Sequence, residues 1–304
     1  MLPSTFTSDQ MLGCLVGGAL GDAIGSAVEG CSIIPPYSEI LNRIWTVTDD
    51  TQLTLATCEA IIAARRIEPE VIAAAMLRWY RRGLLSGIGS STLKALRDLD
   101  AGVHWALAGR QGEYAAGNGA AMRIAPLAFL LRPDNYDDRR VLRDVCRITH
   151  HSDEAYAGAL AVVLALHLIN SVPADRLLAQ VAAHLPDTKV RDRCHEYAAL
   201  SPSFSATEAG NRFGSSGYVV ESVPLAIFAA SRCADIGFES MLEQVLCAGG
   251  DTDTNASIAG QIAGCKIGMA ALPKTLLDRF PQPDEILATA QQFAEVVSSV
   301  TPRL

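Results

Sequence analysis

Apolar residues recur at intervals of three and four along nearly the whole chain, and runs that alternate between apolar and polar residues are scarce. This spacing places apolar side chains on one face of a helix and predicts an all-α protein. Ser152 precedes two acidic residues, and Pro69 and Pro173 stand early in two further segments, as is typical of helix starts. The expected helices are Thr51–Arg66, Pro69–Leu85, Ser91–Leu99, Asp137–Thr149, Asp153–Asn170, Pro173–His184, Val220–Ala234, Glu239–Cys247, Thr254–Ala271 and Pro283–Ser299.

The interiors of these segments are rich in Ala, Leu and Gly, whereas aromatic residues make up only 6% of the chain. Small side chains let helix backbones approach closely, which favours a compact orthogonal helical bundle over a long coiled coil. No heptad pattern is sustained, no repeat of fixed period recurs, and no Pro/Ser-rich linker divides the chain. We therefore predict a single all-α domain over residues 1–304.

Charge and composition argue against nucleic acid and membranes as partners of this protein. The chain has 33 acidic and 25 basic residues and a net charge of −8, whereas proteins that mainly bind nucleic acid need clustered Lys and Arg for phosphate contacts. The longest apolar run, Ala155–Ile169, is shorter than the roughly 20 residues that span a bilayer and contains His167, so we expect a buried core helix. The first basic residue is Arg43, so the basic start of a secretory signal is missing. We expect a cytoplasmic protein with no nucleic-acid and no membrane partner.

The eight cysteines are scattered and form no Cys-x-x-Cys pair. Several lie in apolar segments such as Leu53–Ala63 and Gln244–Ala248, where a free cysteine packs as a small apolar side chain. Neither a zinc finger nor a disulfide scaffold is indicated.

Two acidic clusters lie at expected helix starts, Thr48-Asp49-Asp50-Thr51 and Asp251-Thr252-Asp253-Thr254. Asp and Thr favour helix N-termini, so capping explains part of each cluster. The clusters contain more oxygen atoms than capping needs, however, and carboxylate and hydroxyl oxygens are the ligands that Mg²⁺ and Mn²⁺ prefer. These residues alone leave both a metal site and plain capping open.

Three further features are candidates for ligand contact. The loop Gly117-Asn118-Gly119 stands before an expected helix start at Ala120-Ala121-Met122-Arg123, where backbone N–H groups favour an anion, although Asn-Gly is also an ordinary turn signal. His150 lies at a break between two helices, where the alternative is a capping or exposed histidine. Tyr218 lies in Gly217-Tyr218-Val219-Val220-Glu221, a short extended entry to a helix, and either faces a base or ribose or packs in the core.

The N-terminal segment Gly17–Gly25 is rich in Gly and Ala, which permits tight helix packing. Within it, Asp22 is expected to be a structural hydrogen-bond acceptor. Glu29 follows near the C-terminal end of this segment, where the helix dipole favours a cation, so Glu29 is a candidate functional carboxylate.

Taken together and in this order, these motifs resemble those of the ADP-ribosylglycohydrolase family, over roughly residues 12 to 270. Each motif alone is modest evidence, whereas the complete set in family order is specific. The matching segments are Gly21-Asp22, Glu29, Thr48-Asp49-Asp50-Thr51, Gly87-Ile88-Gly89, Gly117-Asn118-Gly119-Ala120-Ala121-Met122-Arg123, Thr149-His150, Gly217-Tyr218-Val219-Val220-Glu221 and Gly249-Gly250-Asp251-Thr252-Asp253-Thr254-Asn255.

The resemblance implies an all-α fold with a two-metal centre, usually Mg²⁺ and sometimes Mn²⁺, at the bottom of an ADP-ribose cleft. Asp253 would bridge the two metal ions, and Glu29 or Asp50 would act as the general base. The implied metal ligands are Thr48, Asp49, Asp50, Asp251, Asp253 and Thr254, and the implied substrate contacts are Gly117, Asn118, Gly119 and His150 around the phosphates and ribose, with Tyr218 on the nucleotide side.

Two departures from the family pattern affect this expectation. Ala116 stands where some members carry an aromatic residue, which puts one ribose or base contact in doubt. The segment between Gly30 and Thr48 is short and contains Pro35-Pro36, so a flap that carries Glu29 would be trimmed or stiff.

The resemblance implies a hydrolase that removes ADP-ribose from modified protein and releases free ADP-ribose. We expect mono-ADP-ribosyl-arginine as the substrate, because protonated guanidine needs less acid catalysis to leave than an alkoxide, and compact members of the family commonly act on it. One alternative is a hydrolase of serine-linked, polymeric or O-acetyl ADP-ribose. The other is a non-catalytic or dual-role immunity protein that binds ADP-ribose or an ADP-ribosylating toxin.

Overall fold

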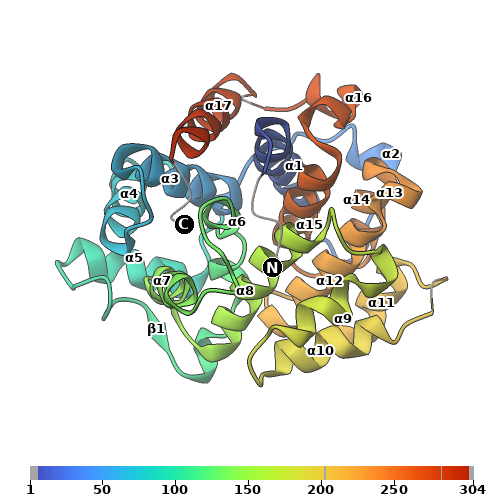
Figure 1. Ribbon diagram of the computed structural model, residues 1–304. Helices are drawn as coiled ribbons and strands as arrows, with labels where there is room; N and C mark the ends of the chain where they lie inside the picture. The colour runs from blue at the N-terminus through green and yellow to red at the C-terminus, as the bar shows by residue number, and fades with distance from the viewer. Residues whose placement is uncertain (1–5, 202, 282, 301–304) are drawn as a thin grey trace.

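The computed structural model describes residues 6–201, 203–281 and 283–300; the remaining residues of the domain expected over 1–304 lie outside this part. Its described part is a bundle of α-helices with two strands of two residues each, as the periodicity predicts (Figure 1). The elements are α1 (Ser8–Ser26), α2 (Tyr37–Ile40), α3 (Asp49–Ala64), α4 (Pro69–Arg81), α5 (Ser90–Asp100), β1 (Arg110–Gln111), η1 (Glu113–Ala115), η2 (Asn118–Ala120), α6 (Ala125–Ala128), α7 (Tyr136–Arg147), β2 (His150–His151), α8 (Asp153–Leu168), α9 (Ala174–Ala183), α10 (Lys189–Ala198), α11 (Ala206–Phe213), α12 (Val219–Ser231), α13 (Cys233–Ile236), α14 (Phe238–Cys247), α15 (Thr252–Ile267), η3 (Met269–Ala271), α16 (Lys274–Leu277) and α17 (Pro283–Ser299).

Every expected helix is present, as α3, α4, α5, α7, α8, α9, α12, α14, α15 and α17, with ends that differ by a few residues. The expected C-terminal ends of α4 and α15 are each wrong by four residues: α4 ends at Arg81, shortly before Gly83 with its φ of 65°, and α15 ends at Ile267, because Gly268 adopts a φ of 79°. Pro173 lies at the N-cap position of α9 instead of inside the helix. Helix α10 has no expected counterpart, because half of its ten residues are charged and only Val190, Cys194 and Tyr197 are buried.

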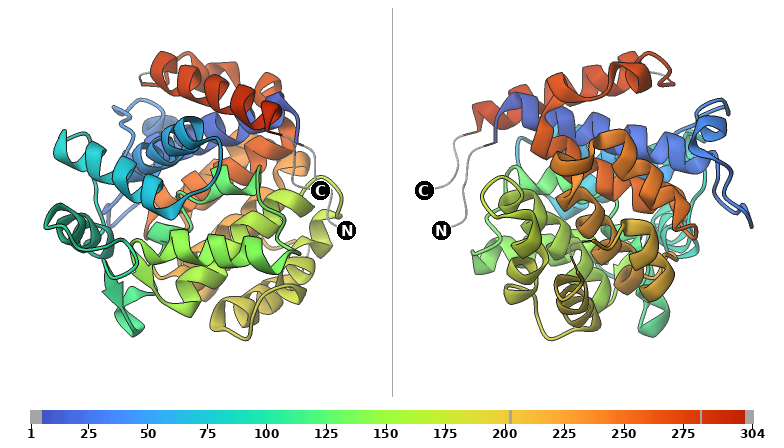
Figure 2. Two further views of the ribbon diagram at one scale, coloured as in Figure 1. Left: turned by 60° about the vertical axis from the view of Figure 1, so that its left-hand side comes forward. Right: turned by 90° about the vertical axis from the view of Figure 1, so that its right-hand side faces the viewer.

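The core is built around α8, which carries the longest apolar run and is buried along almost its whole length. Its His167 is also buried, and the ring Nε2 lies 2.9 Å from the carbonyl oxygen of Ala128. Helices α9, α10 and α11 lie together on the side of the molecule opposite α17 (Figure 2). In the described part of the chain, no helix is both long enough and apolar enough to cross a membrane.

Helices α1 and α15 lie against each other in antiparallel orientation, backbone to backbone (Figure 1). A Cβ atom on Gly13 would come 2.3 Å from the carbonyl oxygen of Gly264, and one on Gly21 would come 2.0 Å from that of Ala256. Only glycine permits this approach. The packing brings the C-terminal end of α1 beside the N-terminal end of α15, where Thr252 Oγ1 donates a hydrogen bond to the Gly25 carbonyl at 2.9 Å.

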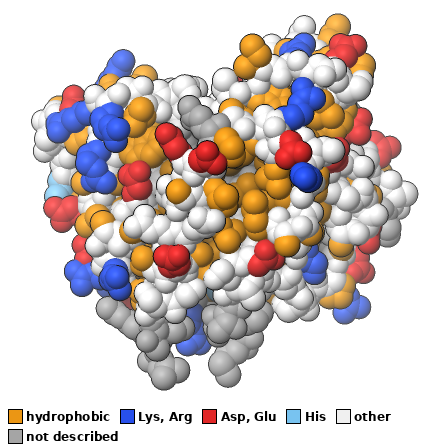
Figure 3. Space-filling view, turned by 90° about the horizontal axis from the view of Figure 1, so that it is seen from above, with side chains coloured by type: hydrophobic (Ala, Val, Ile, Leu, Met, Phe, Trp, Pro, Cys, Tyr) orange, Lys and Arg blue, Asp and Glu red, His pale blue; other side chains and the backbone are white. Residues whose placement is uncertain are grey.

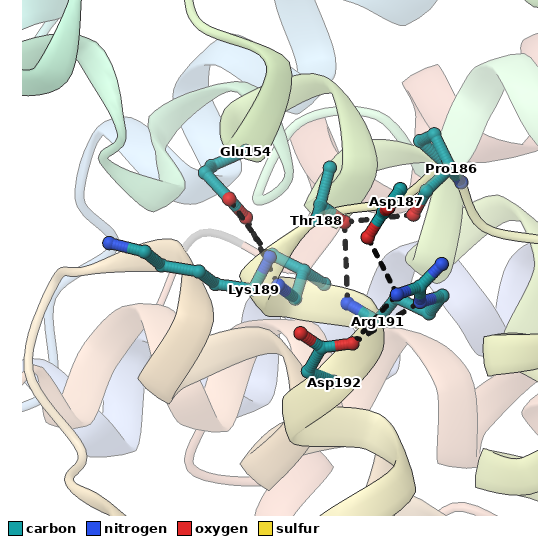
Figure 4. Close-up of polar contacts among 8 residues, drawn as sticks. Glu154, Pro186, Asp187, Thr188, Lys189, Arg191 and Asp192 are labelled. Atoms are coloured by element: carbon teal, nitrogen blue, oxygen red, sulfur yellow. Dashed lines mark hydrogen bonds and ion pairs between the residues drawn. The ribbon is translucent and has the colours of Figure 1, made fainter.

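The N-terminus of α10 is capped from α8 (Figure 4). The Glu154 carboxylate accepts hydrogen bonds from the backbone N–H groups of Lys189 at 2.9 Å and Val190 at 3.0 Å. Arg191 forms an ion pair with Asp187 at 2.6 Å on the exposed side. A carboxylate at this end of a helix satisfies free N–H groups and complements the dipole, so Glu154 ties a weakly apolar helix to the core.

The eight cysteines are free thiols, and six of them are buried, including Cys58. The expectation of packing within Gln244–Ala248 is wrong for Cys247, which is exposed. Cys247 is the last residue of α14, and the buried face of that helix ends at Leu246.

Surface charge is mixed on the face that carries α17. Seen from above, hydrophobic side chains gather near the middle of this face (Figure 3). Lys and Arg side chains stand at several separate places, most of them with Asp or Glu side chains nearby. This face therefore carries no single basic surface of the kind that phosphate contacts need.

Candidate active site and metal centre

Three helix ends bring acidic side chains together. Asp22 lies near the end of α1, Asp50 in the first turn of α3 and Asp253 in the first turn of α15. Each offers a carboxylate oxygen within 4.8 Å of the other two, and all three residues are buried. The close packing of α1 on α15 thus places these carboxylates at one point inside the protein.

A second acidic group shares one residue with the first. Glu29, Asp251 and Asp253 offer carboxylate oxygens that also lie within 4.8 Å of one another. Glu29 comes from the turn after α1 and is exposed, whereas Asp253 is only 4% exposed. The two groups together contain five carboxylates, and Asp253 is the member that joins them.

Capping does not explain either cluster. Thr48 and Asp251 stand at the N-cap positions of α3 and α15, but neither side chain makes a cap hydrogen bond to its own helix. Asp22 accepts hydrogen bonds from the backbone N–H groups of Thr48 at 2.9 Å and Thr51 at 3.1 Å, so it caps α3 from α1 and is the structural acceptor that we expect. The Asp251 carboxylate instead accepts a hydrogen bond from Asn118 Nδ2 at 2.7 Å.

Ionised carboxylates packed this closely destabilise the folded protein unless a proton or a cation neutralises their charge. Burial, followed by repulsion from Asp253 and other carboxylates, raises the pKa of Asp50 well above its ordinary value. Burial and the adjacent Asp251 carboxyl raise the pKa of Asp253 to about 9. Asp50 Oδ1 is buried and has no hydrogen-bond partner in the described part of the chain. A set of oxygen donors with an unpartnered carboxylate oxygen fits a hard divalent cation.

The acidic groups open onto a cleft of about 500 Å³. Thr48, Asp50 and Tyr218 are not among the described residues that line it: Thr48 and Asp50 are buried behind the wall, and Tyr218 takes part through its backbone. The predicted site residues that do line the cleft are Glu29, Asp49, Gly117, Asn118, Gly119, His150, Asp251, Asp253 and Thr254.

The glycine loop forms one wall of the cleft. Gly117 pairs with Tyr218 in an isolated antiparallel bridge, and the Asn118 N–H donates to the Gly217 carbonyl at 3.0 Å, so the extended entry to α12 is confirmed. A Cβ on Gly119 would come 2.9 Å from His150 Cε1, so the histidine ring packs directly on this loop. The expected helix start over residues 120–123 is wrong: a single 3-10 turn ends at Ala120, and α6 begins only at residue 125.

The loop that leads into α5 also lines the cleft, beside the glycine loop: a Cβ on Gly119 would lie 3.1 Å from Thr92 Oγ1. The Asp49 N–H donates to the Ser86 carbonyl at 2.8 Å, and burial raises the pKa of Asp49 although the Gly89 N–H donates to its carboxylate. Ser90, Ser91 and Thr92 also line the cleft and were missed by sequence reasoning. The signal that marks them is a run of hydroxyl residues directly after a glycine at a helix start.

Comparison with known proteins agrees with this geometry. A model of the ADP-ribosylglycohydrolase family matches residues 3–302. The chain is 31% identical to an uncharacterized protein of Archaeoglobus fulgidus, over 85% of this chain and 88% of that protein. It is 28% identical to ADP-ribosylarginine hydrolase Tri1 of Pseudomonas putida, over 95% of this chain and 80% of the relative. It is 26% identical to human ADP-ribosylhydrolase ARH3, over 86% of each.

A solved structure described as an ADP-ribosylglycohydrolase-related protein complex superposes with a TM-score of 0.74 and 28% sequence identity. The match covers 95% of this chain and 98% of that one. The all-α fold is therefore shared over nearly the full length of both chains. Together with the family match over residues 3–302, this shows that the protein belongs to the ADP-ribosylglycohydrolase family and is a glycohydrolase that acts on ADP-ribosylated substrates.

Proposed function

We propose that this protein removes ADP-ribose from arginine side chains of modified proteins and that it needs divalent cations, Mg²⁺ in the first place. The observation that carries the proposal is the pair of acidic groups that share Asp253, a residue that lines the cleft together with Glu29 and Asp251. Similarity to a relative named ADP-ribosylarginine hydrolase Tri1, over 95% of this chain, supports the arginine linkage.

The residues of the two acidic groups would hold two cations, and Asp253 belongs to both groups. Thr48 Oγ1 and Thr254 Oγ1 lie 3.4 Å and 3.2 Å from Asp50 Oδ2, so these hydroxyl oxygens stand beside the same carboxylate. When bound, the cations would supply Lewis-acid stabilisation of charge that develops at the distal ribose. The proposed ligands are Thr48, Asp49, Asp50, Asp251, Asp253 and Thr254, and Asp22 supports them by accepting hydrogen bonds from Thr48 and Thr51.

The substrate would enter from the open side of the cleft. We assign the diphosphate and ribose contacts to Gly117, Asn118, Gly119 and His150, because glycines let the backbone N–H groups approach an anion and His150 packs against them. Tyr218 supports this loop through its backbone bridge to Gly117.

Glu29 is the general base in this proposal. It lines the cleft beside Asp251 and Asp253, whereas Asp50 is only 1% exposed and lies behind the wall. The bond between ribose C1″ and the guanidine nitrogen breaks, and the attacking water gives its hydroxyl to C1″ and its proton to Glu29. The nearby carboxylates stabilise the oxocarbenium character of the transition state, and the proton held by Glu29 then passes to the nitrogen of the departing guanidine.

The test is a panel of four substrates: arginine-modified protein, serine-modified protein, poly(ADP-ribose) and O-acetyl-ADP-ribose. Each is incubated with Mg²⁺, with Mn²⁺ or with EDTA, and released ADP-ribose is measured by mass spectrometry. Release from the arginine-linked substrate alone, lost in EDTA, is the expected result. Release from another linkage alone would overturn the arginine assignment, and full activity in EDTA would overturn the cation requirement.

A further inference from the structure

Arg123 is completely buried, and its role is not explained by an ion pair. No carboxylate of the described residues lies within 4.0 Å of its guanidinium, and its Nε and Nη1 atoms have no hydrogen-bond partner there. Its Nη2 donates to Thr149 Oγ1 at 2.9 Å and to the Val145 carbonyl at 3.3 Å. A buried cation without a carboxylate partner destabilises the folded protein. We therefore expect the hydrogen bonds that Arg123 makes to Thr149 and Val145 to have a function.

The contact with Arg123 fixes the direction of the Thr149 hydroxyl. Thr149 is 0% exposed, and its Oγ1 has two neighbours at hydrogen-bond distance in the described part of the chain, Arg123 Nη2 and His150 Nδ1 at 2.8 Å. Arg123 can only donate. The hydroxyl hydrogen of Thr149 therefore finds its acceptor in His150 Nδ1, since any other arrangement leaves a buried hydroxyl hydrogen unpaired.

This arrangement decides which ring nitrogen of His150 carries the proton. With Nδ1 as an acceptor, a neutral imidazole must carry its hydrogen on Nε2. Nε2 is the atom that faces the glycine loop: a Cβ on Gly117 would lie 3.3 Å from it, and one on Gly119 would lie 3.4 Å from it. His150 also lines the cleft. The N–H bond is thus directed toward the wall where an anion would be bound.

The ring is neutral at neutral pH. Burial lowers the pKa of His150 to about 3, and the positive charge of Arg123 and the neighbouring His151 and Arg110 act in the same direction. His150 therefore offers a neutral hydrogen-bond donor, and its tautomer decides whether that donor points into the cleft.

We propose that Arg123 and Thr149 are positioning residues: they hold His150 in the Nε2–H tautomer, so that its N–H group is ready to bind the diphosphate of the substrate. The identity of the ligand rests on the proposed function, whereas the tautomer does not. The proposal covers residues that do not touch the ligand themselves, because Arg123 and Thr149 are fully buried.

The first test observes the tautomer directly. In protein labelled with ¹⁵N-histidine, long-range ¹H–¹⁵N spectra at pH 7.5 separate the six histidines, and the His150 signals are those lost in His150→Gln. Wild-type protein is expected to show a protonated Nε2 and an unprotonated Nδ1 that accepts a hydrogen bond. In Thr149→Val, which keeps the shape and removes the hydroxyl, the Nδ1 signal is expected to lose the shift caused by that hydrogen bond.

The second test measures binding of ADP-ribose by calorimetry and the kinetic constants with the modified protein. Thr149→Val is expected to weaken ADP-ribose binding roughly three- to tenfold, as for one weakened hydrogen bond to an anion, and to raise KM more than it lowers kcat. Thr149→Ser restores the hydroxyl and is expected to restore the affinity. Thr57→Val is the matched control, because Thr57 is equally buried and its hydroxyl donates to the Leu53 carbonyl of its own helix at 2.8 Å.

The outcomes separate this inference from the proposed function. A wild-type spectrum with the proton on Nδ1 overturns the inference, and so does a Thr149→Val protein with unchanged His150 signals and unchanged affinity. Weakening that is equal in Thr57→Val and Thr149→Val also overturns it, because a general loss of packing would then be the cause. A protein that shows the expected tautomer and its change in Thr149→Val but binds no ADP-ribose would contradict the proposed function and leave the tautomer assignment standing.

Discussion

Replacing Asp253 by Asn tests the centre of the site, because this carboxylate belongs to both acidic groups. Asn keeps the shape of the side chain and removes its charge. Without metal at pH 8, the folded wild-type protein must keep on Asp253 a proton that the unfolded chain has released, which costs stability, so Asp253→Asn is expected to be more stable than wild type in EDTA at this pH. With metal, the loss of the shared ligand is expected to lower turnover roughly a hundredfold or more.

The size of the metal-free effect follows from the pKa of Asp253, which is raised from 3.8 to about 9. Between these values the folded protein holds a proton that the unfolded chain has released, so stability falls as pH rises. One such proton corresponds to about 1.4 kcal/mol per pH unit, or about 2.7 kcal/mol between pH 6 and pH 8. The Asn side chain of Asp253→Asn cannot take up this proton. Between pH 6 and pH 8 the variant is therefore expected to lose about 2.7 kcal/mol less unfolding free energy than the wild-type protein.

The assay is urea unfolding of both proteins at pH 6, 7 and 8 in EDTA, repeated with Mg²⁺. At a Mg²⁺ concentration of about 100 Kd the wild-type protein gains about 2.7 kcal/mol, and the variant is expected to gain almost nothing. Asp278→Asn is the control, since Asp278 is exposed and directly follows α16. The reasoning is refuted if the variant keeps the pH slope of wild type in EDTA, or if Mg²⁺ stabilises the variant as strongly as wild type.

Three further predictions concern single residues. Glu29→Gln is expected to lower kcat roughly 10²- to 10⁴-fold with ADP-ribose affinity within about twofold of wild type, and near-normal kcat would remove Glu29 as the general base. Gly21→Ala would place a Cβ 2.0 Å from the Ala256 carbonyl oxygen and is expected to cost about 3 kcal/mol or more in urea unfolding; an unchanged midpoint would contradict the close packing of α1 on α15. Glu154→Ala removes the carboxylate that accepts two backbone N–H groups of α10 and is expected to cost about 1–2 kcal/mol with unchanged kcat/KM, whereas a loss of activity at full stability would show a role outside capping.

The sequence by itself determined the helical class and the position of most helices. Apolar spacing is a local property of the chain, and it identifies which face of each helix is buried whatever that face packs against. The two acidic clusters could also be recognised as unusual helix starts, because capping needs fewer oxygen atoms than they contain. Helix α10 shows the limit of this signal: its few buried residues are too sparse to stand out, and Glu154 of another helix secures its N-terminus.

Only the tertiary structure decided which oxygen atoms meet. Asp22 joins Asp50 and Asp253 because glycines let α1 and α15 pack backbone to backbone, and this contact sets their register. Asp50 could not be distinguished from Glu29 by sequence, since both are carboxylates near a helix end; burial places Asp50 behind the wall and leaves Glu29 in the cleft. The local sequence pattern predicts which side chains are buried. Contacts between segments that are far apart in the chain depend on how whole helices pack against each other. The site consists of such contacts, so only the tertiary structure could show it.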